Sequence, residues 1–184
     1  FIEAHYNIGN AFKFLDRFDE AIESHRRLLV LDPNHLKAQY SLLALTDNLT
    51  EAPPDGYVAS AFDYFAPQFD HQMKVGNCKI PETLRLVAGQ LMDDRKIVPV
   101  TSFSRVLDMG CGTGLAGEAF KDISEELHGV DLSGKMLELA KDKKVYDAIY
   151  QTDNEDYLSQ TDIHYDLILA TDVFVYSGPL ETLF

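Results

Sequence analysis

The 184 residues include no tryptophan and only two cysteines, and no run of 18 or more uncharged apolar residues occurs. Two cysteines cannot build a disulfide framework, and the missing apolar run argues against a transmembrane helix. The opening stretch, "FIEAHYNIGNAF", has neither a basic segment nor a long apolar segment, so no signal peptide is predicted. We therefore interpret Cys78 and Cys111 as free thiols and expect a cytoplasmic protein.

Positive charge is also scarce. Sixteen lysines and arginines face 30 aspartates and glutamates, which gives a formal net charge of −14. A surface this acidic repels phosphate backbones, so nucleic acid is not expected as the main partner. No membrane partner is expected either, because the chain has no long apolar segment.

The first part of the chain repeats itself with a period of 34 residues. Ala4 aligns with Ala38 and Tyr6 with Tyr40. Apolar residues recur at helical spacing in "EAHYNIGNAFKFL" (3–15) and in "FDEAIESHRRLLVLDP" (18–33), which predicts two amphipathic helices. The stretch "LKAQYSLLALTDNL" (36–49) predicts a third helix.

These residues resemble the tetratricopeptide repeat. The family pattern of a bulky residue, Leu-Gly, an aromatic residue, alanine and proline corresponds here to His5, Ile8-Gly9, Phe12, Ala21 and Pro33. The resemblance implies a helical hairpin followed by a closing helix over residues 1–50, with a groove for a protein or peptide partner. We interpret the histidines of this region as packing residues rather than metal ligands. Because an array needs about three repeats, further repeats are expected before Phe1.

The stretch 51–56, "EAPPDG", predicts a linker because it holds a Pro-Pro pair and a glycine. The aromatic segment that follows, "YVASAFDYFAPQFDHQM" (57–73), predicts a helix interrupted at Pro67. Its aromatic side chains suit either a core stripe or a cover over a bound cofactor. The next stretch, "PETLRLVAGQLM" (81–92), predicts a helix that starts at a proline.

From Ser104 onward, short apolar strands alternate with helices. The predicted strands are "RVLDMG", "LHGVDLS", "AIYQTD" and "YDLILATDVFVY". This alternation predicts a doubly wound parallel sheet that binds ligands at the carboxyl ends of its strands.

A glycine-rich loop, "VLDMGCGTGLAG" (106–117), follows the first of these strands. No Gly-Lys-Ser/Thr occurs there, so a nucleoside triphosphate site is excluded. The last six residues match the dinucleotide pattern G-x-G-x-x-G, and that match is weak by itself. Asp108 before the first glycine would repel a pyrophosphate and attract a cationic group.

With Asp108 and its three spaced glycines, "VLDMGCGTG" resembles motif I of class I S-adenosylmethionine-dependent methyltransferases. Asp131 and Asp153, on the next two strands, match the positions that this family uses for the ribose and the adenine. The order of parts also resembles a bacterial family of predicted methyltransferases with N-terminal repeats. The resemblance implies the following cofactor contacts: Asp108, Gly110, Cys111, Gly112, Gly114, Asp131, Leu132, Asp153, Asn154 and Thr171, with Tyr57 and Phe65 from the aromatic segment.

We therefore expect an all-α tetratricopeptide region (1–50), a linker (51–56) and a Rossmann-like methyltransferase domain (57–184). The resemblance implies three more strands after the fourth, so the domain is expected to be incomplete at its carboxyl end and inactive as a fragment. S-adenosylmethionine is the expected cofactor; no metal is expected, and no catalytic base is assigned. Two alternatives stay open: a repeat-containing adaptor with a cofactor-sensing or inactive domain, and a nicotinamide-dependent oxidoreductase.

Overall fold

The computed structural model describes residues 2–46, 53, 56–94 and 102–176 and divides into two compact units, which meet in sequence at Val58 and Ala59. The predicted linker lies largely outside the described residues. No described helix combines the length and apolar character that a membrane span requires.

Three helices lie wholly within the described residues of the first unit, and each begins within a residue of its predicted start. They are α1 (Ile2–Phe14), α2 (Phe18–Leu31) and α3 (Leu36–Leu45). The ring of Tyr6 lies near two imidazoles, with centroids 5.7 Å from that of His25 and 5.4 Å from that of His35. The hydroxyl of Ser24 donates to the carbonyl of His5 at 2.9 Å, which joins α2 to α1.

Gly9 allows α1 and α2 to approach closely. A Cβ atom at this position would lie 2.6 Å from Cε1 of His25, which is fully buried. Neither ring nitrogen of His25 has a hydrogen-bond partner among the described residues. Burial therefore lowers the pKa of His25. His25 is a packing residue of this hairpin.

Replacing Gly9 with alanine is expected to lower the free energy of unfolding of the first unit by about 1–2 kcal/mol, because overpacking against His25 outweighs the gain in helix propensity. Urea denaturation followed by circular dichroism measures this. Gly89→Ala, measured on the stability of the second unit, is the control for a helical glycine without close packing, since a Cβ there meets Nη1 of Arg85 at an ordinary 3.5 Å. It should be neutral or stabilising. Equal effects of the two substitutions would contradict the packing argument.

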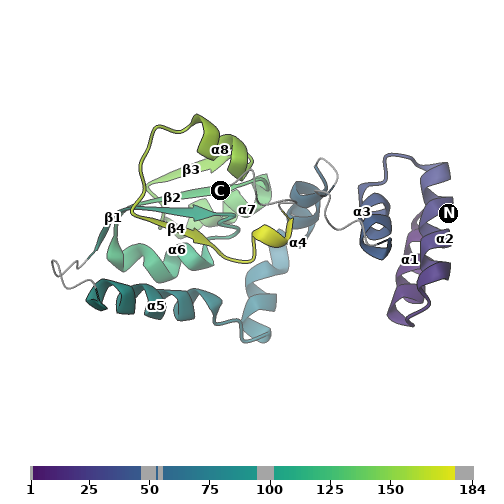
Figure 1. The fold of residues 1–184 in the computed structure, drawn as a ribbon, viewed down its shortest axis with the longest axis horizontal. Coiled ribbons are helices and arrows are strands. Elements are labelled where there is room, and N and C mark those ends of the chain that lie inside the picture. Colours follow the sequence, from purple (N-terminus) through teal and green to yellow (C-terminus); the bar gives the residue numbers. More distant parts are fainter. Residues whose placement is uncertain (1, 47–52, 54–55, 95–101, 177–184) are drawn as a thin grey trace. The chain divides into compact units, whose positions relative to one another are not determined.

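The second unit is built on a four-stranded parallel sheet of order β3-β2-β1-β4 (Figure 1). Its strands are β1 (Phe103–Met109), β2 (Ser124–Asp131), β3 (Ala148–Gln151) and β4 (Leu167–Ala170). Its helices are α4 (Tyr57–Val75, which starts in the first unit), α5 (Ile80–Asp94), α6 (Leu115–Phe120), α7 (Gly134–Lys143) and α8 (Asn154–Gln160). Two short 3-10 helices are η1 (Lys121–Ile123) and η2 (Phe174–Tyr176, which ends in the first unit).

Side chains of β1 alternate between two cores, one on each face of the sheet. Val106 packs with Phe120 of α6 and Leu127 of β2. Leu107 and Met109 pack with Val130 and Tyr157 on the other face. Figure 1 shows α6 and α5 on one side of the sheet and α8 on the other. The predicted doubly wound parallel sheet is thus confirmed.

Helix α4 corrects one prediction, because it runs through Pro67 without interruption. A proline removes one backbone hydrogen bond and usually bends or breaks a helix. Here side chains on both sides of Pro67 hold α4 in place: Asp63 binds Ser133, and Asp70 binds Thr113. Tertiary hydrogen bonds compensate for the one that the proline cannot make.

The fourth strand is shorter than the predicted stretch 165–176. It covers only Leu167–Ala170, and Asp172 has a left-handed φ of 56°. A β-strand cannot continue through a left-handed residue. The backbone therefore turns at Asp172 and forms a 3-10 turn at Phe174–Tyr176.

Candidate functional site

The glycine loop joins β1 to α6 through three left-handed residues. Gly110, Gly112 and Gly114 have φ values of 62°, 53° and 90°. A Cβ atom on Gly110 would meet Cγ2 of Val173 at 2.5 Å, whereas one on Gly112 would meet nothing within 4 Å. The loop is therefore tightly packed at its first glycine and open at its second. Cys111, between them, is buried, and its amide donates to the carbonyl of Val130 at 2.9 Å.

Asp108, near the end of β1, is fully buried. Its Oδ2 accepts a hydrogen bond of 2.6 Å from the hydroxyl of Tyr146, while its Oδ1 has no partner among the described residues. Burial raises the pKa of Asp108 to about 7, and the nearby carboxyl of Asp131 adds to that rise. A buried carboxylate with one unpaired oxygen suits a cationic hydrogen-bond donor.

Asp131 ends β2, beside the loop. Its Oδ2 accepts from the amide of Gly112, and its Oδ1 accepts from the amide of Ser133, both at 2.8 Å. Burial raises its pKa. Ser133 is the N-cap of α7, because its hydroxyl accepts from the amide of Met136. The structure thus brings Asp131 and the glycine loop into direct contact.

The remaining predicted residues of the sheet follow the carboxyl ends of their strands. Asp153 is the N-cap of α8, and its Oδ1 accepts from the amide of Glu155 at 2.8 Å. The adjacent Asn154 has a buried Oδ1 with no partner among the described residues. Leu132 follows β2 with a partly exposed side chain, and Thr171 directly follows β4.

The two predicted aromatic contacts, Tyr57 and Phe65, both lie on α4. Tyr57 belongs to the first unit, where its ring stacks on Tyr40 with a centroid distance of 4.4 Å. Phe65 is partly exposed and makes an edge contact with Tyr64. Their contact with a cofactor stays a prediction.

Two carboxylates of α4 that the sequence argument passed over bind the site instead. Oδ1 of Asp63 accepts from the hydroxyl of Ser133 at 2.6 Å and from the amide of Lys135 at 3.2 Å. Asp70 accepts from the hydroxyl of Thr113 in the glycine loop and pairs with Lys143 of α7 at 2.9 Å. Their spacing of seven residues puts them on one face of the helix, and this spacing is the sequence pattern that could have indicated a shared contact.

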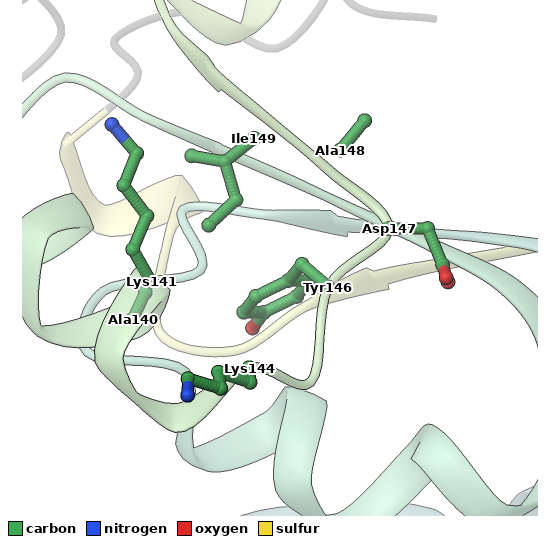
Figure 2. A pocket seen from close by; sticks show the side chains of 7 residues that line it. All are labelled: Ala140, Lys141, Lys144, Tyr146, Asp147, Ala148 and Ile149. Atoms are coloured by element: carbon green, nitrogen blue, oxygen red, sulfur yellow. The ribbon is translucent and has the colours of Figure 1, made fainter.

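Tyr146 was also missed. It precedes β3 and lines a surface pocket of about 350 Å³ together with residues of α7 and β3 (Figure 2). The other lining residues are Ala140, Lys141, Lys144, Asp147, Ala148 and Ile149. The predicted cofactor contacts are not among them. This pocket is therefore separate from the carboxyl ends of the strands.

Comparison with known proteins agrees with this geometry. Residues 106–183 match the family model of a methyltransferase domain, and residues 2–35 match that of the tetratricopeptide repeat. One curated relative is the malonyl-[acyl-carrier protein] O-methyltransferase of Enterobacter lignolyticus (strain SCF1). It is 34% identical over 98 residues, which are 53% of this chain and 35% of that protein. The chain thus spans about a third of this relative's length.

Two solved structures share the fold of the second unit. DesVI of Streptomyces venezuelae gives a TM-score of 0.51 at 23% identity, over 64% of this chain and 48% of that one. CalS10, an amino pentose methyltransferase from Micromonospora echinaspora, was solved with S-adenosylmethionine. It gives a TM-score of 0.50 at 19% identity, over 63% of this chain and 47% of that one. The predicted class I methyltransferase fold and the predicted repeat are both confirmed.

Proposed function

We propose that the protein is an S-adenosylmethionine-dependent methyltransferase, on the premise that residues 106–183 match the model of a methyltransferase domain, that residues 2–35 match that of the tetratricopeptide repeat and that the sheet has the class I fold. Its repeats would recruit a protein partner or substrate. When bound, the cofactor would supply a methyl group, which a nucleophile of the acceptor would take in line from the sulfonium sulfur, with S-adenosylhomocysteine as the leaving group.

The observation that carries this proposal is the unpaired Oδ1 of Asp108 behind an open glycine loop. Asp108 is fully buried, and Oδ1 lacks a partner among the described residues. A Cβ atom on Gly112 would meet no atom within 4 Å beyond its own neighbours in the chain. S-adenosylmethionine carries an ammonium and a sulfonium, and a positive charge here would offset the cost of burying the carboxylate. The residues present therefore fit this cofactor.

Neighbouring polar groups support the same ligand. Each carboxylate oxygen of Asp131 accepts one backbone amide and keeps a further lone pair, so both can still accept ribose hydroxyls. The unpaired Oδ1 of Asn154 supports an adenine contact, because the adenine amine is a hydrogen-bond donor. A dinucleotide pyrophosphate would instead lie close to the carboxylates of Asp108 and Asp131, which disfavours a nicotinamide cofactor.

Calorimetric titration with S-adenosylhomocysteine tests the proposal. We expect binding by the wild type and a loss of affinity of at least tenfold for Asp131→Ala, because the variant lacks charge-assisted hydrogen bonds to the ribose. Asp142→Ala is the matched control: it removes the same charge from an exposed position of α7 and should bind like the wild type. Circular dichroism checks that both variants fold.

Two results would count against this assignment. Binding of NADH without binding of S-adenosylhomocysteine would favour the oxidoreductase. An unchanged heat of binding in Asp131→Ala would show that Asp131 does not contact the ligand. Methyl transfer itself is measured with radiolabelled S-adenosylmethionine and a cell lysate as the source of acceptors. A protein that binds the cofactor and labels nothing in that assay would be an adaptor.

A further inference from the structure

The side chain of Tyr146 reaches from the surface pocket to the buried end of β1. The residue lies between Lys144, the C-cap of α7, and β3. Figure 2 shows its ring at the pocket, between the residues of α7 and those of β3. At its inner end, the hydroxyl donates to Oδ2 of Asp108 at 2.6 Å. One side chain therefore connects the α7–β3 loop with the carboxylate at the glycine loop.

Three glycines make room for this ring. A Cβ atom on Gly117 would lie 2.5 Å from Cζ and Oη of Tyr146, and one on Gly114 would lie 3.1 Å from its Cε2. A Cβ atom on Gly129 of β2, which is paired with Asp108, would lie 3.2 Å from Cδ1 of the ring. The space that these three glycines leave determines the position of the ring and therefore of its hydroxyl.

The hydroxyl decides which oxygen of Asp108 is left for a ligand. It occupies Oδ2, and Oδ1 remains without a partner among the described residues. The other groups that act on Asp108 are the carboxyl of Asp131, the thiol of Cys111 and the amide of Gly117. The carboxyl of Asp131 disfavours ionisation of Asp108, whereas the hydroxyl of Tyr146 and the amide of Gly117 favour it.

We propose that Tyr146 is a positioning residue of the cofactor site, which holds Asp108 through Oδ2 so that Oδ1 accepts the ammonium of the cofactor. The inference rests on the proposed function, because it takes S-adenosylmethionine as the ligand of the glycine loop. Tyr146 acts through Asp108 and does not itself touch the ligand. Its hydroxyl also keeps Asp108 ionised at a pH where burial would otherwise favour the neutral acid.

Tyr146→Phe tests this, because the ring stays and the hydroxyl goes. The affinity for S-adenosylhomocysteine at pH 7 should fall about fivefold to tenfold, as expected for loss of a hydrogen bond to a charged group. The loss should shrink above about pH 9, where Asp108 is ionised in both proteins. Tyr150→Phe, on β3 and in the core of the other face, is the matched control and should leave affinity and pH profile unchanged.

A second measurement needs no ligand. The pKa of the Asp108 carboxyl, followed by carbon-detected NMR in the free protein, should rise in Tyr146→Phe. Gly117→Ala should raise it as well, since the added methyl group displaces the hydroxyl; this variant serves if Tyr146→Phe does not fold. An unchanged Asp108 pKa in a folded variant would overturn the inference.

The two proposals fail in different ways. If the wild type binds S-adenosylhomocysteine and Tyr146→Phe binds it with the same affinity and pH profile, the role of Tyr146 is refuted and the proposed function stands. If the wild type does not bind the ligand at any pH, the proposed function is refuted, whatever the Asp108 pKa does.

Discussion

Gly110→Ala should lower the free energy of unfolding of the second unit by about 3 kcal/mol. The substitution forces a non-glycine residue to φ 62°, which costs about 1–2 kcal/mol. It also puts a methyl group 2.5 Å from Cγ2 of Val173, a buried side chain that follows β4, and such overpacking adds about 1–3 kcal/mol. Chemical denaturation followed by fluorescence of the tyrosines measures the change.

Gly112→Ala is the matched control two residues further along the loop. Its φ is also left-handed, at 53°, but its Cβ meets no atom within 4 Å. Its free energy of unfolding should therefore fall only by the backbone strain, which is about 1 kcal/mol. Its larger effect should be on the affinity for S-adenosylhomocysteine, because the methyl group enters the space proposed for the ligand. A loss of stability as large as that of Gly110→Ala would show that Val173 is not the cause.

Asp108 should make the second unit less stable as the pH rises from about 4 to about 7. Its pKa in the folded protein is raised from 3.8 to about 7, so the folded state binds the proton more tightly than the unfolded state. The stabilisation is fully present below the unfolded value and is lost as the pH passes the folded one. By linkage, the change amounts to at most about 4 kcal/mol.

Other carboxyls titrate in the same range, and those of Asp63 and Asp147 have lowered pKa values and act in the opposite direction. The comparison is therefore between the wild type and Asp108→Asn, measured by urea denaturation from pH 4 to pH 8. The stability of the wild type relative to the variant should fall with pH and level off above about pH 7.5. A difference that stays constant across this range would mean that Asp108 has an ordinary pKa.

Much of the site was predictable from the sequence because local patterns encode it. Three glycines after an apolar strand predict a tight loop, and all three are left-handed in the structure. An acidic residue after each of the next two strands predicts side chains at one edge of the sheet. Asp131 is the last residue of β2, and Asp153 follows the carboxyl end of β3. Which atoms of a ligand they contact stays a prediction.

The missed features depend on contacts between residues far apart in the sequence. Tyr146 reaches Asp108 across 38 positions, and no spacing rule connects a residue after a helix with a residue before a loop. Asp63 and Asp70 were passed over because charged residues on a helix usually face water, yet both bind turns of the sheet. The same contacts explain why α4 continues through Pro67.

The position of β1 in the sheet has a consequence during synthesis on the ribosome. Val106 pairs with Leu127 on one side and with Leu167 on the other. The second partner is made 40 residues after the first, which takes about 2–8 s at ordinary rates of translation. During this interval one edge of β1, whose last four residues are buried in the folded protein, has no partner within its own sheet. The nascent chain thus passes through a period in which β1 is open to pairing with other chains. This period ends only when β4 has left the ribosome.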